Sequence, residues 1–225
     1  MSSPERLLLA APMGIEARLV RSGAREAHVH RTGMGPRNAT AAAQRLRELP
    51  GEAMLVIGFC GALERHLQPG EIVIADRVYA ADDEGHAQAS IACPGAEQLA
   101  QALSRSGLSV HVAPVVCVGK LALGERREQL RKGGAAAVDM ESVWLAPGAQ
   151  DRPFAVVRVV LDTPQRELFR PQMVPLALRA GAALRKTAGA LQEAVSQHGL
   201  HTLWSAGHPA GAAQSTPSPE SEVQA

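Results

Sequence analysis

Short apolar runs alternate with amphipathic segments along most of the chain. The runs are rich in Leu, Val, Ile and Ala and are bounded by Pro, Gly or Asp, which is typical of buried strands. The segments between them carry Ala and Leu at helical spacing. The pattern predicts strands at residues 7–11, 28–32, 54–57, 71–75, 110–118, 135–139 and 154–161, and helices at 38–49, 96–106, 124–132 and 174–197.

This alternation predicts a single three-layer α/β domain, with a mixed, mostly parallel central sheet flanked by helices. Hydrophobic residues make up 46% of the 225 residues and aromatic residues only 3%, so Ala, Val and Leu must fill the core. We expect the domain to cover residues 1–198. Residues 199–225 are rich in Pro, Ser and Ala and are expected to form a mostly disordered tail.

The charge and the cysteine content of the chain narrow the range of possible functions and cellular compartments. The formal net charge is +1 without a basic run, which argues against nucleic-acid binding. No apolar stretch approaches the roughly 18 residues that suggest a membrane span, and the N-terminus does not resemble a signal peptide. Three widely separated cysteines indicate reduced thiols in a cytoplasmic protein. Neither metal-ligand spacing nor a cofactor motif is present, so we expect no metal and no cofactor.

Two carboxylates, Asp139 and Glu141, follow the apolar residues 135–138. If this segment is a strand, both acids lie on one face, with Met140 on the other. The alternative is the first turn of a helix, with Asp139 as the cap and Glu141 near the positive end of the helix dipole. The local pattern leaves the two interpretations open.

Further candidate site residues also lie at the ends of predicted strands. Glu16 follows the first strand closely, a glycine loop at residues 58–61 follows the third, and Asp162 follows the last. Taken singly, Asp162 suits a turn and Glu16 suits a solvated helix face. In a parallel sheet, however, these ends share one rim, so the groups can meet in one pocket and act as acid and base.

Several segments together resemble the nucleoside phosphorylase and nucleosidase superfamily, the type that includes methylthioadenosine/S-adenosylhomocysteine nucleosidase. Within it, residues 137–142 and 153–166 are most similar to the hopanoid-associated branch, which is thought to remove adenine from adenosylhopane. The matching segments are Ala-Pro-Met-Gly-Ile-Glu at 11–16, Thr-Gly-Met-Gly at 32–35, Gly-Phe-Cys-Gly-Ala-Leu at 58–63, Pro-Gly-Glu-Ile-Val-Ile-Ala-Asp at 69–76, Ala-Val-Asp-Met-Glu-Ser at 137–142 and Val-Arg-Val-Val-Leu-Asp at 157–162.

The resemblance implies a role for each site residue. Glu16 would activate the attacking water, and Asp162 would donate a proton toward a purine ring nitrogen. Glu141 would bind the ribose hydroxyls, with Met140 packed on the sugar. The resemblance also implies substrate contacts from Phe59 and Gly61, and a homodimer whose second subunit helps to close the 5′ pocket.

Departures from the superfamily's pattern favour hydrolysis. Phosphorolytic relatives hold phosphate with an Arg and a Ser at positions that here carry Val56 and Phe59, and a buried phosphate would lack charge partners. We therefore expect adenine release by water from a 5′-modified adenosine such as adenosylhopane, in which the nucleoside is linked to a lipid. The alternatives are a phosphate-dependent phosphorylase and a catalytically silent nucleoside-binding protein.

Overall fold

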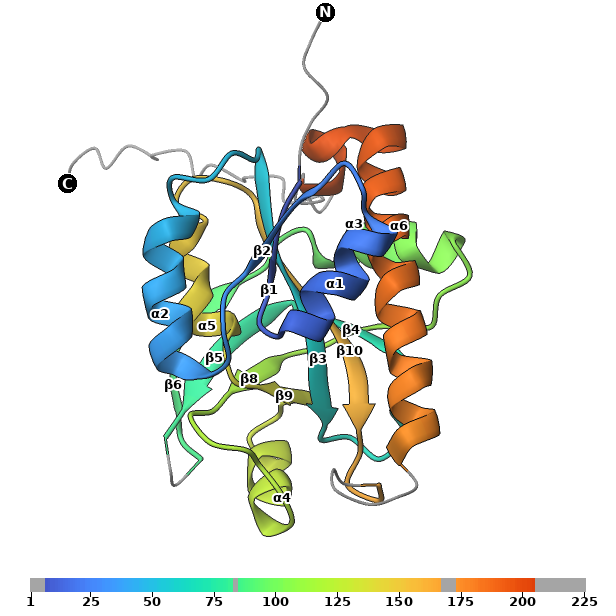
Figure 1. Ribbon diagram of the computed structural model, residues 1–225. Helices are drawn as coiled ribbons and strands as arrows, with labels where there is room; N and C mark the ends of the chain where they lie inside the picture. Colours follow the sequence, from blue (N-terminus) through green and yellow to red (C-terminus); the bar gives the residue numbers. More distant parts are fainter. Residues whose placement is uncertain (1–6, 83–84, 167–172, 205–225) are drawn as a thin grey trace, which may run out of the picture.

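A curled, ten-stranded mixed sheet runs through the middle of the molecule, with helices on both of its faces (Figure 1). The computed structural model describes residues 7–82, 85–166 and 173–204. The helices are α1 (Gly14–Gly23), α2 (Gly35–Leu46), α3 (Ala96–Arg105), α4 (Glu125–Lys132), α5 (Ser142–Leu145), the 3-10 turn η1 (Ala146–Gly148) and α6 (Met173–Trp204). The strands are β1 (Leu7–Ala11), β2 (His28–Arg31), β3 (Ala53–Ala62), β4 (Ile72–Ile74), β5 (Arg77–Ala81), β6 (Ala87–Ala92), β7 (Val110–Val112), β8 (Val115–Cys117), β9 (Ala137–Asp139) and β10 (Phe154–Asp162).

The sheet branches at β3, its longest strand. The strand order is β6-β5-β8-β9-β3-β10-β4-β7, and β1, itself paired with β2, joins β3 outside this path. The first half of β3 pairs in parallel with β1, whereas its last two residues pair antiparallel with β9. Strand β10 runs parallel to β3 along nearly its whole length. The carboxyl ends of β1, β3 and β10 therefore point the same way, as the predicted mostly parallel sheet requires.

Alternation along the strands creates two apolar layers. On β1, Leu7 and Leu9 belong to the core beneath α1, α3 and α6, whereas Leu8 and Ala10 face the core beneath α2 and α5. Strands β3 and β10 divide their residues in the same way because successive side chains point to opposite faces. Ala, Val and Leu dominate both layers, as the low aromatic content predicts.

The structure corrects several predicted boundaries. Residues 58–61 continue strand β3 and do not form a loop, because Gly58 and Gly61 remain paired with β10. Residues 110–118 form two strands, since the chain leaves β4 at Ala113 and joins β5 at Val115, with Pro114 between them. Strands β5 and β6 were not predicted, and α2 starts at Gly35, three residues before its predicted start.

The last helix is longer than expected. It continues through a kink at Gly199 to Trp204, whose indole N–H donates to the carbonyl of Phe154. Residues 199–204 therefore pack on the domain, and the rest of the predicted tail, 205–225, lies outside the described residues.

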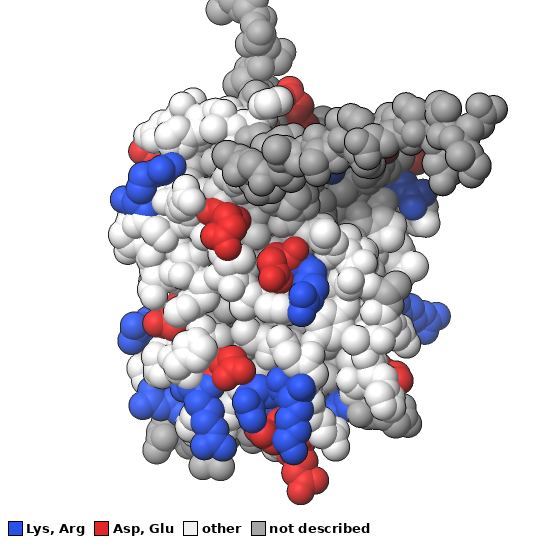
Figure 2. All heavy atoms as spheres, turned by 180° about the vertical axis from the view of Figure 1, so that it is seen from behind, with Lys and Arg blue, Asp and Glu red and all other residues white. Residues whose placement is uncertain are grey.

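Surface charge is sparse over the face opposite to that of Figure 1. Figure 2 shows Lys and Arg gathered at the lower end of this face, with Asp and Glu among and above them. None of the helices in the described part of the chain is both long enough and apolar enough to cross a membrane.

Candidate active site

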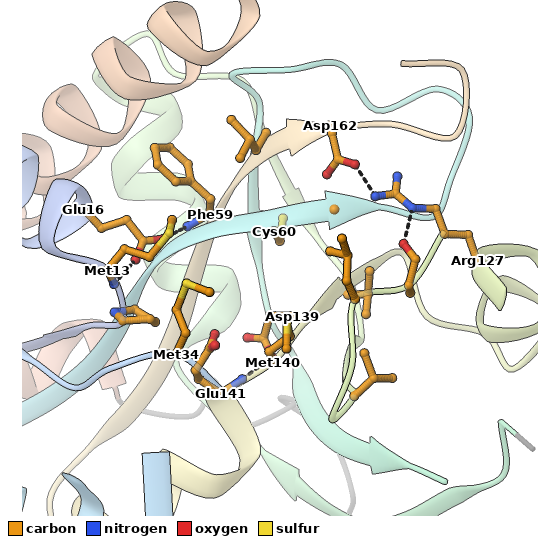
Figure 3. Close-up of a pocket in the computed structure, with 17 residues that line it drawn as sticks. Met13, Glu16, Met34, Phe59, Cys60, Arg127, Asp139, Met140, Glu141 and Asp162 are labelled. Carbon is orange, nitrogen blue, oxygen red and sulfur yellow. Dashed lines mark hydrogen bonds and ion pairs between the residues drawn. The ribbon is translucent and has the colours of Figure 1, made fainter. Parts of the chain in front are cut away.

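A pocket opens where the carboxyl ends of β1, β3 and β10 meet the segment that follows β9 (Figure 3). Most of its lining is apolar, with Met13, Met34 and Leu161 among the lining residues. Every charged side chain that is buried among the described residues lies in or directly behind this pocket, namely Glu16, Arg127, Asp139, Glu141, Arg158 and Asp162. Such a concentration of buried charge in an apolar cavity is typical of a functional site.

Glu16 lies in the first turn of α1 and is 1% exposed. The backbone N–H groups of Met13 and Phe59 each donate to one of its carboxylate oxygens over 2.6 Å. Burial raises the pKa of Glu16 to about 7, although Arg158 and the two N–H donors oppose the rise. The interpretation of Glu16 as a solvated surface charge is therefore wrong.

Arg158 is a fully buried cation in the middle of β10, directly behind the pocket. Its guanidinium lies 2.6 Å from the carboxylate of Asp139 and 3.7 Å from that of Glu141. It also donates to the hydroxyl of Ser142 over 2.8 Å. Burial opposes this charge, but the surrounding carboxylates outweigh the opposition and hold the pKa of Arg158 above its ordinary value.

Asp139 shows that both interpretations of residues 139–142 hold in part. Strand β9 ends at Asp139, and one carboxylate oxygen accepts the backbone N–H groups of Glu141 and Ser142. The other carboxylate oxygen accepts the Ser142 hydroxyl and contacts Arg158. Asp139 thus fixes the turn into α5 while it also belongs to the charged network of the site.

Glu141 contacts Arg158 in the same charged network, and it also lines the pocket. The backbone N–H of Gly35 donates to its carboxylate over 2.8 Å. Burial and the nearby charge of Asp139 raise the pKa of Glu141, and Arg158 opposes them. Its neighbour Met140 also lines the pocket and does not point away from it, so the predicted opposite placement of Met140 is wrong.

Asp162 ends β10 at the opposite side of the pocket from Glu16 (Figure 3). It is 2% exposed, and the guanidinium of Arg127 contacts its Oδ2. Arg127 comes from the first turn of α4 and is also buried. The structure therefore provides a cation beside this carboxyl that the sequence pattern did not indicate.

The structure brings all six predicted site residues to this one pocket. Phe59 and Gly61 line it from β3, together with Glu16, Met140, Glu141 and Asp162. Val56, in contrast, points into the core beneath α2 and is fully buried. We did not predict Arg127 or Arg158. Of these two, Arg158 could have been found from the sequence, because it is a charged residue that interrupts an otherwise apolar strand.

Comparison with known proteins identifies the family. The model of the Phosphorylase superfamily matches residues 10–188, and the chain belongs to this superfamily. No curated protein matches the chain in sequence.

Solved structures of bacterial nucleosidases share the fold. The chain is similar to the 5′-methylthioadenosine/S-adenosylhomocysteine nucleosidase from Neisseria meningitidis, with a TM-score of 0.70, 20% identity and coverage of 84% of this chain and 99% of that one. The corresponding nucleosidase from Campylobacter jejuni gives a TM-score of 0.72 at 13% identity, covering 86% and 99% of the two chains. At such identities the likeness establishes the fold alone.

Proposed function

We propose that the protein hydrolyses the N-glycosidic bond of a purine nucleoside. The observation that carries this proposal is Glu16, a buried carboxyl with a pKa of about 7 inside an apolar pocket. A general base works best when its pKa lies near the operating pH. The Neisseria meningitidis nucleosidase is in complex with methylthio-immucillin-A, so the shared fold supports the same class of substrate for this chain.

Glu16 would activate the attacking water. Each of its oxygens already accepts one backbone N–H, and each retains a second acceptor position. A water bound there would donate one proton to Glu16 and present its oxygen to the sugar. The two fixed N–H donors hold the carboxylate in place, so little reorganisation is needed when the water attacks.

Glu141 and Met140 would bind the ribose, and Phe59 and Gly61 would complete the contacts with the substrate. Glu141 accepts the backbone N–H of Gly35 on its Oε1, and its two carboxylate oxygens together offer further acceptor positions for sugar hydroxyls. Its negative charge, held in place by Arg158, would also stabilise the positive charge that develops on the sugar as the bond breaks. Asp162 would donate a proton to the leaving purine.

Water rather than phosphate is the proposed nucleophile. Val56 and Phe59 are both apolar, and Val56 points away from the pocket into the core. Among the described residues that line the pocket, the cation is Arg127, and it already contacts Asp162. A phosphate dianion would therefore be desolvated without a charge partner near the sugar, which is strongly unfavourable.

An apolar 5′ substituent would occupy the outer part of the pocket. Met34 and Leu121 line it while remaining 53% and 46% exposed. Ile15 and Leu123, which adjoin the lining residues Glu16 and Ala122 in sequence, are also exposed, and the substituent would meet hydrophobic side chains as it leaves the pocket. These contacts support adenosylhopane as the proposed substrate. A role in hopanoid biosynthesis would follow from that substrate.

A substrate panel tests this assignment. The protein is incubated without phosphate with adenosine, 5′-methylthioadenosine, S-adenosylhomocysteine and an adenosylhopane extract, and free adenine is quantified. The highest kcat/KM is expected for adenosylhopane. Preference for the polar homocysteine substituent would contradict the hopanoid assignment but leave the hydrolase proposal intact. Tight binding without adenine release would identify a silent binding protein.

A homodimer in the cytoplasm is the proposed state of the protein. The exposed apolar side chains near the pocket could be covered in part by a second subunit. The three cysteines are unpaired and buried, which suits a reducing compartment. Light scattering should give the mass of two chains, and a fully active monomer would contradict the dimer.

A further inference from the structure

Arg127 is held rigidly at the base of α4. Its Nε donates to the carbonyl of Ala122 over 2.9 Å, and its Nη1 donates to the carbonyl of Ala62 over 3.3 Å. Its Nη2 contacts Oδ2 of Asp162 (Figure 3). The side chain is 3% exposed and lines the pocket. Three fixed contacts leave the guanidinium in one orientation, with its charge directed at Asp162.

The pair lies directly against the backbone of β3. A Cβ added to Gly61 would be 2.8 Å from Nη2 of Arg127 and 3.2 Å from Oδ1 of Asp162. Only glycine therefore leaves room for both side chains at this point. The contact with Arg127 fixes Oδ2, so that Oδ1 becomes the oxygen that lies over Gly61, which also lines the pocket.

Stability alone gives a poor explanation for this pair. Desolvation of two charges costs about as much as their attraction returns, and apolar replacements of buried pairs are often neutral or stabilising. An arginine held against a buried carboxyl inside an apolar pocket is better explained by chemistry in which the carboxyl changes its charge. Proton donation by Asp162 is such a chemistry, because it turns a neutral acid into a buried carboxylate.

We propose that Arg127 is a positioning residue that stabilises the Asp162 carboxylate formed when the proton passes to the leaving purine. This inference rests on the proposed function. In the step, the proton moves from Oδ1 to a purine ring nitrogen, and the electrons of the glycosidic bond move to the base. The water oxygen bonds to the sugar carbon and gives its proton to Glu16. Solvent then returns a proton to Asp162 and removes one from Glu16.

The test compares a nucleoside with its 7-methylated form, whose base already carries a positive charge and leaves without a proton. Arg127→Met should lower kcat on the unmodified nucleoside by about a hundredfold, the order found when one preorganised stabilising group is removed. KM should change little. Hydrolysis of the 7-methylated nucleoside should be nearly unaffected, and Arg127→Lys, which restores the charge, should recover part of the loss.

Arg126→Met is the matched control. Arg126 is the adjacent arginine, but it donates to the carbonyl of Asp82 and does not line the pocket. Its variant should retain wild-type turnover on both substrates. Thermal unfolding of each variant checks the fold, because Arg127→Met leaves Asp162 without its cation whenever Asp162 is ionised.

The double variant Arg127→Met/Asp162→Asn removes both charges and avoids that penalty. Its loss of kcat should equal that of Asp162→Asn alone, since the two residues act as one unit. Wild-type turnover by folded Arg127→Met, equal losses on both substrates or additive losses in the double variant would each overturn the inference. Failure of the wild-type protein to release a base from any nucleoside would instead reject the proposed function.

Discussion

At the scale of single residues, the pKa of Glu16 determines how the proposed hydrolysis depends on pH. The ionised form is the base, and burial raises its pKa to about 7. Catalytic efficiency should therefore rise as pH increases through about 7, because only the carboxylate of Glu16 can accept the proton of water. The measurement is kcat/KM from pH 5 to pH 9.

The control for this prediction is Glu16→Gln, which keeps the size of the side chain but cannot accept a proton. Its activity should fall by ~10²–10⁴-fold, the usual contribution of a general base, and the rise near pH 7 should disappear. A folded Glu16→Gln protein that keeps the wild-type profile would remove Glu16 from the mechanism.

Single residues also show what the sequence could and could not reveal about the site. Glu16, Glu141 and Asp162 could be predicted because they follow apolar strands whose ends share one rim. Arg127 could not, since it stands beside Arg126 in a highly charged helix and nothing local tells the two apart. Only the tertiary position of α4 buries one arginine and leaves the other partly exposed.

At the scale of elements, β3 explains how the site is assembled. The predicted strand ended before Gly58 because glycines are common in loops. In the structure the strand continues, and the glycines serve as places of close approach. A Cβ added to Gly58 would lie 2.5 Å from Oε1 of Glu16 and 2.9 Å from Nη1 of Arg158. The missing side chain thus makes room for the charged network.

Gly58→Ala should therefore damage both the fold and the site. Crowding of this kind typically costs ~1–3 kcal/mol of stability, and displacement of Glu16 should lower kcat. Gly181→Ala in α6 is the control, because its added Cβ would meet only a methyl group of Leu19 at 3.4 Å. Denaturant unfolding and turnover of both variants check this. If the two variants were equally stable and equally active, the conclusion that Gly58 makes room for Glu16 and Arg158 would be wrong.

The remaining elements fall into two groups. The local sequence pattern determines the boundaries of one group, and contacts with segments far away in the sequence determine those of the other. The periodic helices α3 and α4 and the apolar strands β1 and β10 were predicted to within about a residue, because pattern and burial agree there. The split between β7 and β8 was missed. It depends on which side of the sheet each half joins, and this is set by contacts with β4 and β5 far away in the sequence.

At the scale of the whole molecule, the folded state buries several charged side chains close together, and this burial costs free energy. All the charged side chains buried among its described residues lie at one site, where four carboxyls face two arginines. Burial of a carboxylate favours its neutral form. The folded protein should therefore gain stability when Glu16 is protonated, since its pKa is raised from 4.5 to about 7 on folding.

The sign of this effect can be measured. A raised carboxyl pKa contributes stability that is fully present below pH 4.5 and is lost as pH rises through about 7. Relative to Glu16→Gln, the wild-type free energy of unfolding should fall by roughly 3 kcal/mol between pH 4.5 and pH 8, at about 1.4 kcal/mol per unit of pKa shift. Parallel pH profiles for the two proteins would show that the pKa of Glu16 does not change on folding.

Identification of the sugar product tests the central claim most directly. Purified protein is incubated with a 5′-modified adenosine in phosphate-free buffer and again with phosphate, and both products are analysed by mass spectrometry. Hydrolysis predicts free adenine and a free ribosyl sugar in both buffers, at the same rate, with both products formed at least about a hundredfold more slowly by Glu16→Gln. Adenine that appears only with phosphate, together with a ribose 1-phosphate, would contradict the account.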